Sequence, residues 1–126
     1  MLVTNIAQKE MVKHFMNKPT RYYSDKQEKR TAKVLGGSVQ VGSGCSSFAK
    51  GDVRTEKCLI ECKTSVTEKK SFSIKREMLD KIEEQAFSMK KPYPVLAFNF
   101  GENTPNYYVL NERTFQQFQN FLESFD

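Results

Sequence analysis

Apolar residues recur at three- and four-residue intervals in three parts of the chain, a spacing that places them on one face of a helix. A fourth part, residues 24–35, is rich in charges and is predicted to be helical from its ends. Polar residues suited to helix starts lie at the beginning of the two inner segments: Ser24 or Asp25 in one, and Ser71 or Ser73 in the other. A glycine pair stops the first of these two. We predict helices over residues 5–17, 24–35, 71–89 and from 112 onward.

Shorter apolar runs lie between the predicted helices and are typical of strands. In the run 58–63, CLIECK, alternate side chains share a face, so Glu61 and Lys63 project together while Ile60 and Cys62 point the other way. We predict strands over residues 39–41, 52–54, 58–63, 95–98 and 107–110.

The order of these elements predicts an α/β fold in which helices flank a mixed central sheet. At 126 residues the chain is expected to form one domain, 1–126, with the helix in residues 1–18 at its periphery.

Two of the predicted helices carry marked apolar faces. The stripe in 71–89, which includes Ile74, Ile82 and Phe87, is expected to pack in the core. For the C-terminal helix we favour packing on the chain's own sheet, with contact to a second copy as the alternative. The apolar residues of that helix are Phe115, Phe118, Phe121, Leu122 and Phe125.

Composition narrows the class of protein. No apolar run approaches the roughly 20 residues needed to span a bilayer, and charges interrupt the first residues, unlike a signal peptide. The three cysteines include no C-x-x-C pair, so buried thiols are favoured over a disulfide framework or a zinc site. We therefore expect a cytoplasmic protein that has no membrane partner.

The net charge of +5 is modest, but its distribution is uneven. One basic cluster precedes the first glycine pair, and another follows residue 62. Such clusters are typical of proteins that bind a polyanion. Among their members we expect phosphate contacts from Arg21, Lys29, Arg30, Lys69, Lys70 and Arg76.

The stretch between these clusters, GDVRTEKCLIECK at residues 51–63, holds candidate chemistry. Asp52 lies a short loop upstream of the strand that carries Glu61 and Lys63. Two carboxylates that leave positions open for water and phosphate suit Mg²⁺. With a lysine alongside, this is the equipment for metal-assisted phosphodiester hydrolysis.

Further features occur in a matching order over roughly residues 24–110: a helix carrying Glu28, a glycine turn, the GSG loop at 42–44, the acidic motif, and a strand reading PVLAFNFG. In this order the chain resembles the PD-(D/E)xK nuclease superfamily, and within it the archaeal and phage Holliday junction resolvases. The proline that usually precedes the aspartate is Gly51 here, which leaves the ligand set unchanged.

The resemblance implies a role for each matching residue. Asp52, Glu61, the backbone carbonyl of Cys62 and Glu28 would hold Mg²⁺, with Mn²⁺ as a substitute. Lys63 would position the attacking water or stabilise charge on the phosphate. The resemblance also implies DNA or catalytic contacts from Gly42, Ser43, Gly44 and Lys75.

The function implied is a Mg²⁺-dependent endodeoxyribonuclease that resolves four-way junctions in branched DNA. Because such a junction is approximately two-fold symmetric, a homodimer is expected. Three alternatives remain: a nuclease of the same fold that cuts flaps, nicks or linear duplexes, a DNA-binding protein without turnover, and an interaction module in which the motif is coincidental.

Overall fold

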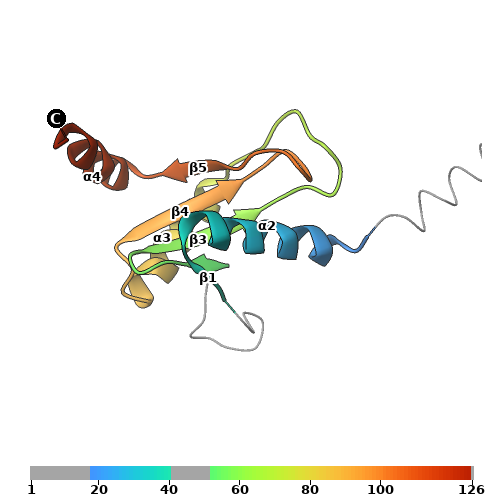
Figure 1. Ribbon diagram of the computed structural model, residues 1–126, viewed down its shortest axis with the longest axis horizontal. Coiled ribbons are helices and arrows are strands. Elements are labelled where there is room, and N and C mark those ends of the chain that lie inside the picture. Colours follow the sequence, from blue (N-terminus) through green and yellow to red (C-terminus); the bar gives the residue numbers. More distant parts are fainter. Residues whose placement is uncertain (1–17, 41–51, 126) are drawn as a thin grey trace, which may run out of the picture.

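The computed structural model describes residues 18–40 and 52–125 (Figure 1). The helix predicted over residues 5–17 lies outside this part of the chain, as do Gly42, Ser43 and Gly44. The described elements are α2 (Thr20–Leu35), β1 (Ser38–Val39), β2 (Val53–Arg54), β3 (Cys58–Lys63), α3 (Arg76–Ser88), β4 (Tyr93–Phe98), β5 (Tyr107–Leu110) and α4 (Glu112–Glu123).

The five strands form one mixed sheet in the order β1-β2-β3-β4-β5. Neighbouring strands are antiparallel except β3 and β4, which are parallel. A parallel pair needs a crossover connection, and α3 provides it. The predicted α/β class, with helices flanking a mixed sheet, is confirmed.

Helices α2 and α3 lie on opposite faces of the sheet, α2 in front and α3 behind in Figure 1. On the α2 face, Ala32 packs against Val53, Ile60, Val95 and Ala97. The alternation of side chains along a strand sends Leu59 and Leu96 to the α3 face, where Ile82 and Ala86 are buried. The sheet is therefore covered on both sides at β3, the strand that carries the predicted site.

Helix α2 begins four residues before the predicted start, at Thr20, so the predicted cap at Ser24 or Asp25 is wrong. Ser24 lies inside the helix, where its hydroxyl donates a hydrogen bond to the carbonyl of Thr20. The predicted end is confirmed: Leu35 is the last residue, and Gly36 follows in the left-handed conformation with φ of 69°.

Helix α3 begins later than predicted, at Arg76, and neither Ser71 nor Ser73 caps it. Residues 71–75 before it form neither helix nor strand, and the ring of Phe72 stacks on Phe98 of β4 with 4.5 Å between ring centroids. This long-range contact keeps the segment out of the helix. Part of the predicted stripe is consequently not core, since Ile74 is 40% and Phe87 85% exposed.

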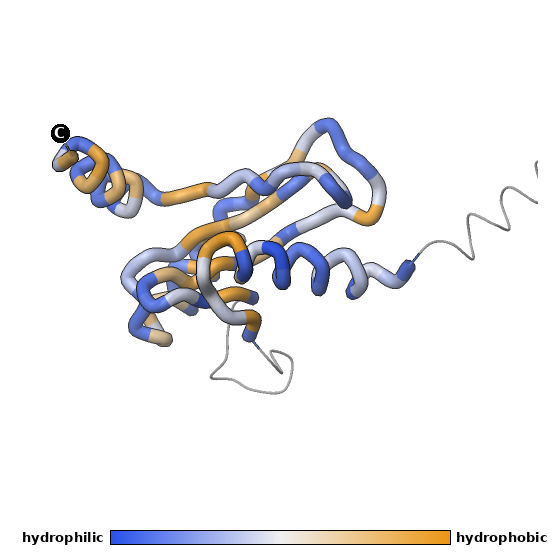
Figure 2. The backbone as a smooth tube through the Cα atoms, in the orientation of Figure 1, coloured by the Kyte–Doolittle hydropathy of each residue, from blue (hydrophilic) through white to orange (hydrophobic). Residues whose placement is uncertain are grey.

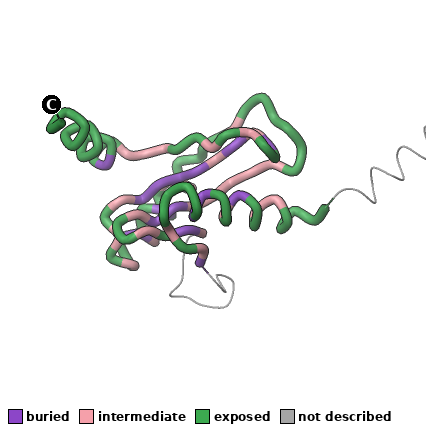
Figure 3. The backbone as a smooth tube through the Cα atoms, in the orientation of Figure 1, coloured by how far each residue is buried: buried purple, intermediate pink, exposed green. Residues whose placement is uncertain are grey.

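Helix α4 does not pack on the chain's own sheet, so that prediction was wrong. Figure 1 shows it projecting from the end of β5, and Figure 3 shows it exposed along almost its whole length. Its phenylalanines and leucine are 44–63% exposed. None of the helices in the described ranges is both long and apolar enough to cross a bilayer.

Candidate metal centre

The candidate site lies at the edge of β3 beside the start of β2. Strand β2 has only two residues, and its pairing reaches Ile60 of β3 through Val53. Just before β2, Asp52 Oδ2 accepts a hydrogen bond of 2.7 Å from the backbone N–H of Cys62. The Asp52 carboxylate thus continues the pairing with β3 past the end of the β2 ladder. It lies beside the Glu61-Cys62-Lys63 end of β3.

The backbone carbonyl of Cys62 lies on the same side of β3 as its N–H, because both groups of a strand residue point to one edge. This is the edge that faces Asp52. The carbonyl that was predicted as a metal ligand is therefore placed on the side of the predicted carboxylate.

Glu61 and Lys63 project from the same face of β3, as predicted. The ammonium of Lys63 lies 3.6 Å from Glu61 Oε1. Both side chains line a hollow of about 190 Å³ beside α3, together with Lys75 and Lys81. Lys75, which the resemblance placed near the site, thus shares a surface with the ion pair.

Cys62 points to the other face, where its Sγ lies 3.8 Å from the hydroxyl of Thr31 on α2. Burial is the main reason that the pKa of the Cys62 thiol is raised to about 12, and the nearby carboxylates add to it. The thiol is neutral at physiological pH and is not a thiolate ligand or nucleophile.

Three carboxylates experience each other's charge at this edge. Burial raises the pKa of Asp52 and, with the charge of Asp52, that of Glu61. Burial and then the charge of Asp52 raise the pKa of Glu28, on α2, to about 7. Lys63 and Lys81 act in the opposite direction on Asp52 and Glu61. A cation bound between Asp52 and Glu61 would favour the charged form of both buried carboxylates.

The oxygen donors of the site suit Mg²⁺ better than a cation whose ligands must all come from protein atoms. Within residues 18–40 and 52–125, no group of three or more His, Cys, Asp or Glu side chains is close enough to hold a metal ion. Mg²⁺ commonly takes one or two carboxylates and completes its shell with water and phosphate. Asp52, Glu61 and the Cys62 carbonyl match that pattern, and direct ligation by Glu28 stays a prediction.

Two residues near the site were missed by the sequence analysis. Lys81 lies one helical turn from Met78 and Gln85, and these side chains line the hollow with Glu61. The signal was its spacing within α3, but a lysine on an exposed helix is usually solvated. Gln27 gave no signal, because its partners come from distant strands.

Gln27 is 5% exposed and joins α2 to the end of β3. Its amide nitrogen donates to the carbonyl of Lys63 at 2.8 Å and to Asn106 Oδ1 at 3.3 Å. Asn106 in turn donates to the hydroxyl of Thr31 at 3.0 Å. The network holds the backbone of Lys63 in place relative to the helix that carries Glu28.

Other predicted phosphate contacts are distributed over both faces of the molecule. Arg21 and Arg76 are exposed and pair with Asp25 and Asp80 at 3.8 and 3.7 Å. Lys29, Lys69 and Lys70 are exposed on α2 and on the loop before α3. The structure brings Lys75 alone of these basic residues into the hollow beside Glu61 and Lys63.

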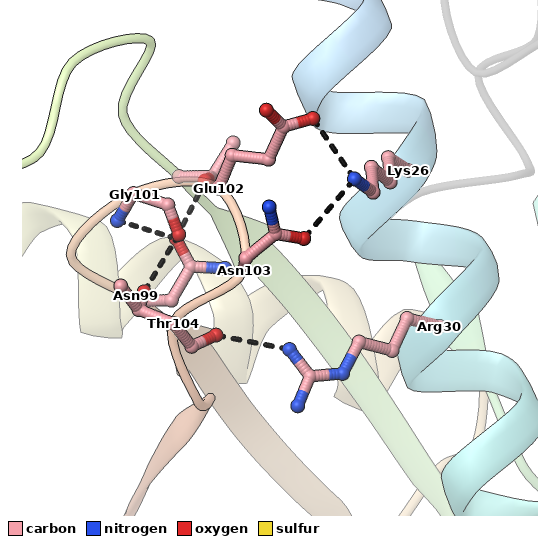
Figure 4. A network of polar contacts seen from close by, with 8 residues as sticks. Lys26, Arg30, Asn99, Gly101, Glu102, Asn103 and Thr104 are labelled. Atoms are coloured by element: carbon pink, nitrogen blue, oxygen red, sulfur yellow. Dashed lines mark hydrogen bonds and ion pairs between the residues drawn. The ribbon is translucent and has the colours of Figure 1, made fainter.

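Arg30 is engaged in a structural contact. Figure 4 shows its guanidinium reaching the loop after β4, where it donates to the carbonyl of Thr104 at 2.9 Å. One turn earlier on α2, Lys26 bonds to Glu102 at 2.9 Å and to Asn103 at 3.3 Å. These contacts join α2 to the β4–β5 loop, and a phosphate contact by Arg30 stays a prediction.

The raised pKa of Glu28 predicts that stability falls as the pH rises. Its carboxyl has an ordinary pKa of 4.5 when unfolded and about 7 when folded. Between these values the unfolded chain releases the proton first, so unfolding is favoured as the pH rises, and the full cost is present above pH 7. With chelator present, Glu28→Gln should therefore stabilise the protein at pH 8 by about 1 kcal/mol, after allowance for solvent screening.

Urea unfolding at pH 4 and pH 8 tests this expectation. At pH 4 the variant and the parent should be equally stable, because the carboxyl is protonated in both states. Glu84→Gln, an exposed position on α3, is the matched control and should change little at either pH. An equal effect of Glu28→Gln at both pH values would contradict the assignment.

Comparisons of the chain with protein-family models, with curated proteins and with solved structures gave no match, so the case for this site depends on its own residues and their geometry.

Proposed function

We propose that this chain is a Mg²⁺-dependent endodeoxyribonuclease that cuts four-way DNA junctions. The observation that supports the proposal most is that Asp52 bonds to the N–H of Cys62, between the two partners of the Glu61–Lys63 ion pair, at a half-buried edge of β3. Two carboxylates and a lysine in this arrangement serve phosphodiester hydrolysis. The resemblance to the junction resolvases supplies the substrate class.

Each residue has a defined part in this chemistry. Asp52 and Glu61 hold the cation together with the carbonyl of Cys62. When held there, Mg²⁺ would supply polarisation of the phosphate and activation of a water. The ammonium of Lys63 orients the attacking water or stabilises charge that develops on the phosphate. By family analogy, water attacks the phosphorus in line and leaves a 5′-phosphate and a 3′-hydroxyl.

The lysines beside the site favour a polyanionic substrate. Lys75 and Lys81 line the same hollow as Lys63, so that three lysines face the two carboxylates of its lining, Glu61 and Glu77. Ammonium groups bind phosphate oxygens as point charges without reading sequence. We therefore propose that the phosphodiester backbone lies along this hollow, with the more distant basic residues holding the other arms.

A four-way junction requires two symmetric cuts. One chain holds one set of the candidate catalytic residues, so two copies related by a two-fold axis are proposed to act on one junction. The second candidate function, a nuclease for flaps, nicks or linear duplexes, uses the same residues and differs in how the copies are arranged. A non-catalytic DNA-binding protein would not need Lys63 beside two acids.

A cleavage assay on matched substrates tests the proposal. In Mg²⁺ the protein should nick a synthetic four-way junction at symmetric positions and leave a linear duplex of the same sequence largely uncut. A flap substrate is the second control. Equal cutting of junction and duplex would favour the second candidate, and binding of the junction without cutting in Mg²⁺ or Mn²⁺ would favour the non-catalytic protein.

A further inference from the structure

Helix α4 presents a large apolar face that the described chain does not cover. Phe115, Phe118, Phe121, Leu122 and Phe125 are 44–63% exposed, and Figure 2 shows hydrophobic segments along α4 although it lies apart from the sheet. Of the five side chains, Phe118 has an aromatic neighbour on the sheet, Tyr93, at 6.3 Å between ring centroids.

The direction of α4 is fixed at its first turn. Asn111 alone separates it from β5, and the Asn111 side chain both accepts from the N–H of Thr114 and donates to Glu83 at 3.0 Å. Arg113 donates to the carbonyl of Pro92 at 2.9 Å. These bonds hold the base of the helix against α3 and β4, while its apolar face continues beyond them.

An unfilled groove lies beside the base of α4. One part is lined by Leu79, Ile82, Leu96 and Val109, between α3 and the strands β4 and β5. The next part is a hollow of about 290 Å³ beside Phe87, and both parts share Glu83, Pro94 and Asn111. Phe87 is 85% exposed at its rim. The same chain thus carries an unpartnered apolar helix and a groove without an occupant among the described residues. The first part of the groove is mainly apolar, and the second also has Glu83, Lys91 and Arg113 in its walls.

We propose that α4 packs into this groove on a second copy of the chain, and that the partner's helix packs reciprocally. Such an exchange is isologous, because each copy supplies the same helix and the same groove. This contact would be the interface of the two-fold assembly proposed above. It rests on the exposure of α4 and on the adjacent groove, and not on nuclease activity.

The area of the apolar face agrees with a stable dimer. A buried aromatic side chain covers roughly 150–250 Å². Four phenylalanines and a leucine that are 44–63% exposed therefore offer about 500 Å² per helix. Two helices, each covering an equal area of its groove, would bury about 2,000 Å² in total, at the upper end of a standard interface.

The charges on α4 argue against a membrane or DNA as the occupant. Helices that bind membrane surfaces are rich in lysine and arginine on their polar face. Helix α4 carries Glu112 and Glu123 against a single Arg113, and its polar face is formed largely by glutamine and asparagine. A face of this kind suits a protein surface and has no cations for lipid or phosphate.

The mass of the full chain in solution, measured by light scattering without DNA, tests the proposal. At tens of micromolar we expect twice the single-chain mass of 14.6 kDa. Phe121→Glu with Leu122→Glu should give the single-chain mass with an unchanged circular dichroism spectrum, since both side chains are exposed. Gln116→Glu with Asn120→Glu adds the same charges on the opposite face and should remain dimeric.

Phe87→Glu tests the groove separately and should also give the single-chain mass.

A parent protein of single-chain mass would overturn the proposal, including one that instead binds vesicles of anionic phospholipid. A dimer that survives the α4 double variant would assign the interface to another surface. Dissociation by the α4 variant but not by Phe87→Glu would show helix pairing rather than exchange, and would overturn the assigned groove. A dimeric protein that fails to cut junctions would leave this proposal standing and contradict only the nuclease.

Discussion

Asp52→Asn and Glu61→Gln should each reduce junction cleavage by at least about 10³-fold. The metal site contributes several kcal/mol of charge stabilisation to the transition state, and each 1.4 kcal/mol corresponds to about tenfold in rate. The asparagine oxygen can still accept the N–H of Cys62 that Asp52 accepts now, so the edge of β3 should keep its structure. Single-turnover cleavage of a labelled junction measures the effect.

Binding separates this effect from a loss of fold. Both variants remove negative charge and leave the basic residues intact, so the junction should bind as tightly as before or slightly more tightly. Glu56→Gln, on the exposed turn between β2 and β3, is the matched control and should cut at the parent rate. A variant at Asp52 or Glu61 that cuts normally would show that this carboxylate is not part of the metal site.

Gln27→Leu should destabilise the protein by about 2 kcal/mol and slow cleavage by about tenfold. Leucine fills the same space but cannot donate to the carbonyl of Lys63 or to Asn106, and each lost buried hydrogen bond costs about 1–3 kcal/mol. Removal of Gln27 Oε1, which is buried and has no partner among the described residues, offsets part of that cost. The end of β3 is then held less firmly, and misplacement of a catalytic group by about 1 Å can cost about 10²-fold in rate.

A second buried glutamine provides the control. Gln40 is 9% exposed, and its side-chain nitrogen has no hydrogen-bond partner that the described structure shows. Gln40→Leu should therefore leave the free energy of unfolding nearly unchanged or raise it. In urea unfolding Gln27→Leu should be less stable than Gln40→Leu, and in single-turnover assays it should cleave more slowly. If Gln27→Leu matched Gln40→Leu in stability and rate, the proposed positioning role of Gln27 would be wrong.

Two strands and the start of α4 were predicted to the residue, whereas β4 begins at Tyr93, two residues before its predicted start. The bounds of β3 and β5 are those that the sequence predicted, because their apolar and β-branched residues are contiguous and turns flank them. The start of α3 could not be predicted, since Phe72 is held out of the helix by stacking on Phe98, a residue 26 positions away in the chain. The capping preference of Ser71 and Ser73 was outweighed by that distant contact.

The candidate site shows the same division. The two-residue period of a strand was enough to place Glu61 and Lys63 on one face. Lys81 and Gln27 were not found, because the reason to single them out is a neighbour supplied by another element. The apolar period of α4 was equally plain, yet it left open what the apolar face contacts.

By itself the sequence determined the α/β class, the strand that carries Glu61-Cys62-Lys63, and the residue types available for holding a cation, since these depend on local period and chemistry. Tertiary structure alone decided three things: Asp52 reaches the N–H of Cys62, Gln27 holds the carbonyl of Lys63, and α4 leaves the sheet with its apolar face exposed. Each of these depends on where segments that are distant in the sequence meet in space. A local pattern of side chains carries no information on which distant segments will meet.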